Sequence, residues 1–251
     1  MNDKNISENF SVAQYFEDIV KDDIKKFDTL LQWSEEDKVA FKFLIKELDV
    51  PSETTKQTGD KLENIVEFII RKTFFFEVYK NVRTTTNEID EVIVLSKLGK
   101  QALHKFNLSR DLIPIPNDIF IGECKNYSKS LNVTYVGKFY SLMKSSNISF
   151  GIIFTQHGLT GTSEDFKDAY GLIKVLKIIE DLKNPDRKFY ILTFTREDYQ
   201  KMIEGHNFFE LVKAKELELQ LHANYKSFLP DRHEAADEIN YIISTLKVNN
   251  I

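Results

Sequence analysis

The chain has 251 residues, of which 42% are hydrophobic and 29% are charged, with 9 glycines and 5 prolines. This composition is typical of a globular protein with one large domain and disfavours the disordered, collagen-like and disulfide-stapled classes. The single cysteine, Cys124, allows neither an intrachain disulfide nor a cysteine-rich zinc site. No apolar run approaches the roughly 20 residues that cross a bilayer, and the N-terminus lacks the pattern of a secretion signal. We therefore expect a cytoplasmic protein with no membrane partner.

The formal net charge of −5 is distributed unevenly along the chain. Residues 1–60 carry a net charge of −6, residues 61–145 of +4 and residues 146–251 of −3. This balance disfavours a simple all-basic nucleic-acid-binding protein. A basic middle between acidic flanks permits a compact phosphate-facing site in the central block.

The first 50 residues are predicted to be helical, because apolar residues recur at spacings of three and four in 10–20 and again in 39–48. The segment 34–37, a serine followed by three acidic residues, is a helix start. The polar stretch 51–59 contains a proline and a glycine and lacks periodicity, so we predict a linker there. The predicted regions are a helical N-terminal region over 1–58, a core over 59–205 and a C-terminal helical region over 206–251.

The core alternates between helix and strand patterns after a first helix at 61–72. The predicted strands are 74–79, 88–95, 119–125, 150–155 and 189–194. The predicted helices between them are 98–106, inside an insertion at 97–117, then 133–145 and 163–182. The first two strands are expected to form a hairpin across the polar turn 83–87, whereas the later strands alternate with helices as parallel crossovers do. These patterns predict an α/β fold with a mixed central sheet flanked by helices.

Charged residues interrupt two of the apolar strands. Glu123 and Lys125 are two positions apart, so both side chains lie on one face of the third strand while Cys124 lies on the other. Asp90 lies within the second strand. Charged groups are rare at such positions unless they are paired, exposed or bound to a metal.

Metal-dependent hydrolysis of a phosphodiester accounts for these residues. Mg²⁺ prefers oxygen ligands, here Asp90, Glu123 and the backbone carbonyl of Cys124, with waters and phosphate oxygens completing its shell. Lys125 would position the attacking water and stabilise the developing charge. Glu63, on the preceding helix, would hold a metal-bound water or a second ion. On spacing alone, the alternative is an ordinary ion pair between Glu123 and Lys125, with Asp90 an exposed strand acid.

The strings Asn87-Glu88-Ile89-Asp90 and Ile121-Gly122-Glu123-Cys124-Lys125-Asn126-Tyr127 resemble the PD-(D/E)xK nuclease superfamily, in particular its Mrr-like restriction endonuclease branch, over 59–195. The resemblance implies a restriction-endonuclease-like core in which Asp90, Glu123, Lys125 and Glu63 are the catalytic and metal-binding residues. It also implies Mg²⁺ as the cofactor, with Mn²⁺ able to substitute. The insertion at 97–117 makes the separation of the two acidic positions longer than is usual for this motif.

Three further residues are expected near the DNA. Lys129 follows the motif directly, and Gln156 and His157 end the fourth strand, where side chains of this fold approach the site. An exposed turn histidine is the alternative interpretation of His157. The glycines at 158–161 lack the lysine of a nucleotide-binding P-loop, and Cys124 has no local histidine to activate it as a nucleophile.

The expected function is a Mg²⁺-dependent endonuclease that cuts double-stranded DNA, with a role in bacterial anti-phage or restriction defence implied by the resemblance. One site cuts one strand, so we expect a homodimer or a partner defence subunit bound through the N-terminal helical region. Two alternatives stay open: a non-catalytic nucleic-acid-binding or assembly subunit of a defence complex, and a structure-specific nuclease that cuts junctions or flaps.

Overall fold

The computed structural model describes residues 12–84, 88–162 and 166–230, with side chains described from residue 19 onward. The helices are α1 (Val12–Leu31), α2 (Glu35–Glu47), α3 (Thr55–Arg71), α4 (Lys97–Lys105), α5 (Val133–Ser145), α6 (Asp168–Lys183), α7 (Arg196–Ile203) and α8 (Phe208–Leu221), with short 3₁₀ helices η1 (Arg110–Leu112) and η2 (Tyr225–Phe228). The strands are β1 (Phe76–Arg83), β2 (Glu88–Leu95), β3 (Ile119–Lys125), β4 (Phe150–Thr155) and β5 (Tyr190–Phe194). None of the described helices is long and apolar enough to span a bilayer.

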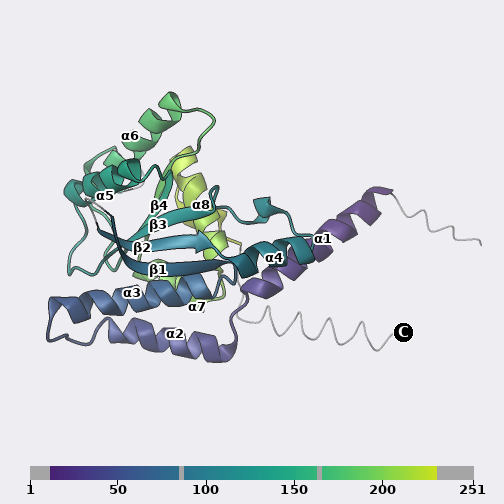
Figure 1. Ribbon diagram of the computed structural model, residues 1–251, viewed down its shortest axis with the longest axis horizontal. Coiled ribbons are helices and arrows are strands. Elements are labelled where there is room, and N and C mark those ends of the chain that lie inside the picture. Colours follow the sequence, from purple (N-terminus) through teal and green to yellow (C-terminus); the bar gives the residue numbers. More distant parts are fainter. Residues whose placement is uncertain (1–11, 85–87, 163–165, 231–251) are drawn as a thin grey trace, which may run out of the picture.

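The strands form a single mixed sheet in which each lies beside its neighbour in the sequence. β1, β2 and β3 pair antiparallel, and β3, β4 and β5 pair parallel, with α5 and α6 as the crossovers. Figure 1 shows α3 with α2 and α7 on one side of the sheet and α5 and α6 on the other. The predicted α/β class with a mixed, helix-flanked sheet is therefore confirmed.

Most predicted elements in the core lie where expected, because their apolar periodicity is continuous. The bounds of β2, β3, β4 and α5 coincide with the prediction. The hairpin between β1 and β2 and the parallel crossovers of the second half are also confirmed. Part of the predicted hairpin turn, residues 85–87, and the start of the predicted helix at 163–165 lie outside the described residues.

Several boundaries differ from the prediction: β1 ends at Arg83 and not at 79, α4 is Lys97–Lys105 and not 98–106, and β5 begins at Tyr190 and not at 189. Two further differences have a clear local cause. The linker predicted at 51–59 ends at Thr54, because the Thr54 side chain accepts a hydrogen bond from the backbone N–H of Gln57 and the Gln57 side chain accepts from the Thr54 backbone, a capping box that starts α3. The first strand begins at Phe76 and not at residue 74, because Phe74 has a left-handed backbone with φ of 67°.

The N-terminal and C-terminal helices share the hydrophobic core of the sheet. The ring of Phe27 in α1 stacks on Phe75 at 5.3 Å between centroids and on Phe209 in α8 at 6.0 Å. Phe41 in α2 is fully buried and contacts Tyr199 in α7. The boundaries at 58 and 205 stay predictions, and the predicted C-terminal region extends into residues 231–251, outside the described part.

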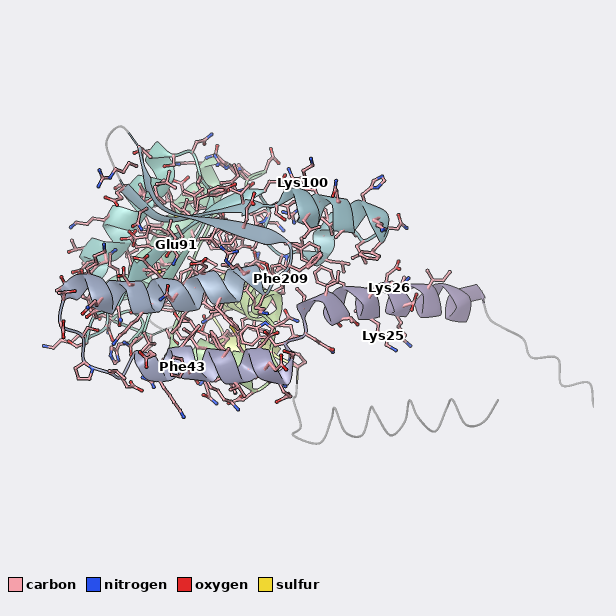
Figure 2. The ribbon with its side chains drawn as sticks, turned by 60° about the horizontal axis from the view of Figure 1, so that its bottom comes forward. Lys25, Lys26, Phe43, Glu91, Lys100 and Phe209 are labelled. Atoms are coloured by element: carbon pink, nitrogen blue, oxygen red, sulfur yellow. The ribbon has the colours of Figure 1, made fainter. Side chains whose placement is uncertain are left out.

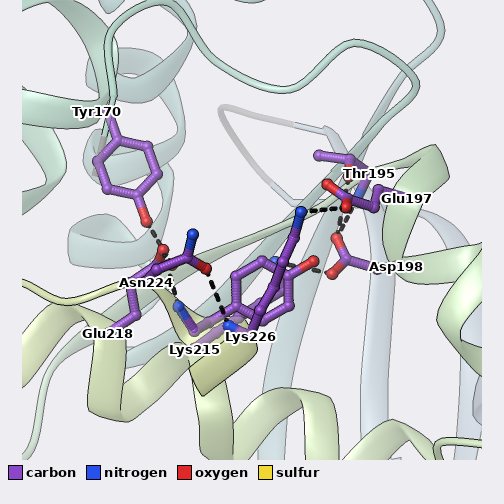
Figure 3. A network of polar contacts seen from close by, with 9 residues as sticks. Tyr170, Thr195, Glu197, Asp198, Lys215, Glu218, Asn224 and Lys226 are labelled. Atoms are coloured by element: carbon purple, nitrogen blue, oxygen red, sulfur yellow. Dashed lines mark hydrogen bonds and ion pairs between the residues drawn. The ribbon is translucent and has the colours of Figure 1, made fainter. Parts of the chain in front are cut away.

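Buried polar contacts attach α8 to the end of the sheet (Figure 3). The Tyr170 hydroxyl in α6 donates to Glu218 in α8, and Lys215 in α8 lies 3.0 Å from Asp198 in α7. The backbone N–H of Thr195 also donates to Asp198, at 2.7 Å. A cavity of about 200 Å³ lies beside these contacts, and its described lining includes none of the predicted site residues.

Candidate active site

The side chain of Lys125 lies at the centre of the predicted site. Its Nζ atom is 2.7 Å from Oε1 of Glu123, 2.9 Å from Oδ2 of Asp90 and 3.2 Å from the carbonyl oxygen of Cys124. The carboxylates of Asp90 and Glu123 are each about one-fifth exposed. The three oxygens that the sequence predicts as metal ligands therefore surround a single positive charge.

The pairing of β2 with β3 brings these residues together. Glu91 lies opposite Gly122 in this antiparallel pair, so Asp90 and Glu123 are the next residues along their strands. The backbone N–H of Cys124 donates to Oδ2 of Asp90 at 3.0 Å and fixes that carboxylate. Sheet register thus joins two acidic residues that the insertion separates widely in the sequence.

The local electrostatics reflect burial and close charges. Burial, followed by the negative charge of Asp90, raises the pKa of Glu123 in spite of the neighbouring Lys125 ammonium. Burial lowers the pKa of Lys125, but the carboxylates of Glu123 and Asp90 outweigh it and raise this pKa. Lys125 is therefore a cation at neutral pH, held by the two carboxylates.

The donor set fits a hard divalent cation. Two carboxylates and one backbone carbonyl are the ligands that Mg²⁺ accepts, with waters at its remaining positions. In the described part of the chain, no three His, Cys, Asp or Glu side chains form a metal-binding group. A metal ion here would therefore take Asp90, Glu123 and the carbonyl of Cys124, and the ammonium of Lys125 would move aside.

Glu63 faces the same region from α3. Its side chain is half-buried, and burial raises its pKa. The opposing Lys80 lowers that pKa, and the charges of Asp90 and Lys125 also act on it. Glu63 thus lies within electrostatic range of Asp90 and Lys125.

The structure also contains a buried acid that the sequence analysis missed. Glu91 is fully buried on the other face of β2, where the Cys124 thiol donates to Oε1 at 3.1 Å and Oε2 has no hydrogen-bond partner among the described residues. Burial is the main reason why its pKa rises to about 8. The sequence contains a clue to this burial: Glu91 alternates with Ile89 and Ile93, and these three residues share the inward face of the strand. Cys124 is a buried thiol whose pKa is raised by burial, consistent with the expected core residue.

The three predicted DNA-contacting residues lie on loops next to the motif. Gln156 donates to the side chain of Asn126, which in turn donates to the carbonyl of Thr58. Lys129 and His157 are exposed. Gln156 is therefore joined to the end of the motif, whereas Lys129 and His157 lie on the adjacent surface.

Asn126 is a second residue whose role the sequence analysis missed. It follows Lys125 and contacts both α3 and the end of β4, so it connects three segments around the site. Lys138 in α5 is a third, because its charge lowers the pKa of Glu123. No local pattern distinguishes either residue, since both act across elements.

A family model described as a restriction endonuclease, the Mrr catalytic domain, matches residues 54–180. The matched segment begins at the cap of α3 and extends into α6, so it includes Glu63, Asp90, Glu123 and Lys125. Comparisons with curated proteins and with solved structures found no match.

Proposed function

The chain belongs to the Mrr-type restriction endonuclease family, and we propose that it is a Mg²⁺-dependent endonuclease that hydrolyses phosphodiester bonds of double-stranded DNA. The observation that carries this proposal is the convergence of Asp90, Glu123 and the Cys124 carbonyl on one cationic position. A site that had lost its catalytic function would have no physical reason to keep two partly buried carboxylates and a carbonyl oxygen within 3.2 Å of the Lys125 ammonium.

Each residue has a role that follows from its position. Asp90, Glu123 and the Cys124 carbonyl would hold Mg²⁺, or Mn²⁺ in its place. The bound ion would supply Lewis acidity and a water of lowered pKa. Lys125, once released from the carboxylates, would orient the attacking water and stabilise negative charge on the phosphate. Glu63 would hold a further water at the edge of the site.

The cellular role and the assembly belong to the same proposal. Family membership supports a role in restriction or anti-phage defence in the cytoplasm. Because one site cuts one strand, cleavage of both strands would use two copies of the chain or two successive cuts. Helix α1 supports such pairing, since Ile19, Val20 and Ile24 are 44%, 56% and 44% exposed on it.

The test is cleavage of plasmid and linear duplex with Mg²⁺ or Mn²⁺, compared with EDTA. We expect metal-dependent nicking or cutting that falls at least about a hundredfold in Lys125→Ala and in Asp90→Ala. Lys42→Ala, an exposed lysine on α2, is the control and keeps full activity. Full activity in both site variants would refute the site assignment.

Two other outcomes would favour the alternative functions. If the wild-type protein cleaves with neither metal but still binds duplex, the chain is a non-catalytic subunit. Cleavage confined to junction or flap substrates would assign a structure-specific nuclease.

A further inference from the structure

Helix α4 and the loop after it form a basic segment of the nuclease core. The insertion 97–117 contains three lysines and one arginine but one acid, a net charge of +3 in a chain of −5. Together with residues 124–145, which carry four lysines and no acid, it accounts for the positive excess of residues 61–145. Neither the fold nor the metal site explains this charge.

The packing of α4 directs its basic residues outward. Gly99, Ala102 and Leu103 are buried, and a Cβ added at Gly99 would lie 2.4 Å from the carbonyl oxygen of Phe75. Residues three and four positions apart share one face of a helix, so the residues between the buried ones share the opposite, outward face. In α4 this outward face is Lys97, Lys100, Gln101, His104 and Lys105, which we call the α4 basic face. Among the described residues, these five line a shallow hollow of about 470 Å³.

Little acidic charge neutralises this face within the described chain. Lys100 lies 2.7 Å from Asp118, and both side chains are about half exposed. An exposed ion pair of this kind is weak and can exchange its carboxylate for a phosphate. No described carboxylate forms an ion pair with Lys97 or Lys105. The α4 basic face is thus available to a polyanion.

The α4 basic face lies at the opposite end of β2 from the candidate active site. Asp90 is near the start of β2, and α4 begins two residues after its end. Six residues of strand from Asp90 to Ser96 span about 20 Å, and the nine residues of α4 add about 13 Å. Figure 1 shows α4 extending onward from this end of the sheet, and Figure 2 shows Lys100 well separated from Glu91, the neighbour of Asp90.

Between the two positions, side chains of the described hairpin are partly open to solvent. The side of β2 that carries Asp90 continues with Val92 and Val94, which are only half-buried. Tyr79 lies opposite Val92 and is 51% exposed. A rod-shaped ligand can therefore extend from the carboxylates to α4 along this side of the hairpin.

We propose that the α4 basic face binds the phosphate backbone of the duplex that lies in the active site, about 6 to 10 base pairs from the scissile phosphate. This spacing follows from about 20 to 33 Å of protein at 3.4 Å per base pair. The inference rests on the proposed function, since it names a second contact for the same substrate. It also explains how a chain of net charge −5 holds DNA, because its positive charge is concentrated where the duplex passes.

The test is duplex binding by fluorescence anisotropy in EDTA, where a metal-dependent nuclease does not cut. The variant is Lys97→Ala, Lys100→Ala and Lys105→Ala together, which keeps the helix because alanine is a good helix former. The matched control is Lys42→Ala, Lys46→Ala and Lys183→Ala, which removes the same charge from exposed positions elsewhere. Each protein is measured with 8- and 30-base-pair duplexes over a series of salt concentrations.

We expect the α4 variant to bind the 30-base-pair duplex about 10- to 100-fold more weakly in low salt, with a salt slope that is smaller by about 2 to 3. The loss should be smaller with the 8-base-pair duplex, which spans about 27 Å from the scissile position and reaches only part of the α4 basic face. The control should match the wild type with both duplexes. An unchanged salt slope in the α4 variant, or an equal loss of affinity in the control, would overturn this inference. The nuclease proposal would still stand in that case, provided that the wild-type protein binds the duplex. If the wild-type protein does not bind duplex at all, the proposed function itself fails.

Discussion

Lys125 holds two carboxylates together at the position where a metal ion would bind. Its ammonium contacts Asp90 at 2.9 Å and Glu123 at 2.7 Å, so it screens their mutual repulsion. Metal binding therefore competes with this lysine. The same side chain pairs with both carboxylates in this structure and, in the proposed mechanism, would contact the phosphate once the metal displaces it.

This competition predicts opposite effects of two substitutions on metal affinity. Lys125→Met removes the competing ammonium, so we expect it to bind Mn²⁺ at least as tightly as the wild type while cleavage is lost. Asp90→Asn removes a charged ligand and should weaken Mn²⁺ binding by at least about tenfold. Isothermal titration calorimetry with Mn²⁺ measures both. Weaker binding by Lys125→Met than by the wild type would show that the lysine does not occupy the metal position.

Glu216 in α8 is a buried acid far from these ligands in the sequence, and it makes stability depend on pH. Burial is the main cause of its raised pKa, from 4.5 to about 7, and Lys213 opposes the rise. A carboxyl with a raised folded-state pKa contributes its full stability below about pH 4.5. That contribution is lost as the pH rises through about 7, an effect on the order of 3 kcal/mol.

Glu216→Gln should remove this dependence, because the amide does not ionise. We expect the free energy of unfolding of the variant to fall less than that of the wild type between pH 5 and pH 8, measured by urea denaturation. Glu53→Gln, at an exposed acid outside α8, is the control for a general charge effect. Identical pH slopes for the wild type and Glu216→Gln would show that Glu216 is ionised throughout.

At the scale of elements, glycines decide how closely helices approach the sheet. Gly99 in α4 has the backbone of Phe75 at 2.4 Å from its ideal Cβ position, and backbone cannot move aside as a side chain can. Gly137 in α5 has no atom within 4 Å of that position. A side chain at Gly99 would therefore collide with backbone, whereas a side chain at Gly137 would have room.

The two glycines therefore form a matched pair for a stability measurement. Gly99→Ala should lower the free energy of unfolding by about 1 to 3 kcal/mol, because α4 must move away from Phe75. Gly137→Ala should raise it by about 0.5 to 1 kcal/mol, since alanine favours the helix and meets no obstacle. Thermal or urea denaturation measures both. A stabilising Gly99→Ala would contradict the close packing of α4 on the backbone of Phe75.

At the scale of the whole molecule, α1 is the element that extends furthest from the sheet (Figure 1). Its C-terminal half packs through Phe27 and Leu31, which are 5% and 4% exposed. Ile19, Val20 and Ile24 continue toward its N-terminal half and are about half exposed. An apolar helix surface of this kind is suited to a second copy of the chain, which the proposed cleavage of both strands would use.

Charge on this surface should disrupt the assembly. Val20→Glu with Ile24→Glu is expected to reduce the mass of the particle to that of one chain in size-exclusion chromatography with light scattering. Double-strand cuts should then fall more than single-strand nicks. Ile178→Glu, on an exposed position of α6, is the control. Equal masses for all three proteins would rule out pairing through α1.

The sequence by itself determined the elements of the core and the residue types of the site. Runs of apolar and β-branched residues bounded by polar segments placed β2 and β3 at their observed bounds. The period of two placed Glu123 and Lys125 on one face with Cys124 on the other. The motif Glu123-Cys124-Lys125 together with Asp90 was sufficient to predict the family, and the order of strands and helices was sufficient to predict the fold class. Local periodicity carries this information because side-chain direction in a strand depends only on position along it.

Only the tertiary structure decided which residues meet. The closeness of Asp90 to Lys125 depends on the register of β2 against β3, and the burial of Glu91 depends on the helices packed over that face. The bridging role of Asn126 and the outward direction of the α4 basic face likewise require several elements in place. These relations are set by strand pairing and close packing between segments distant in the sequence, and no local pattern of residues records them.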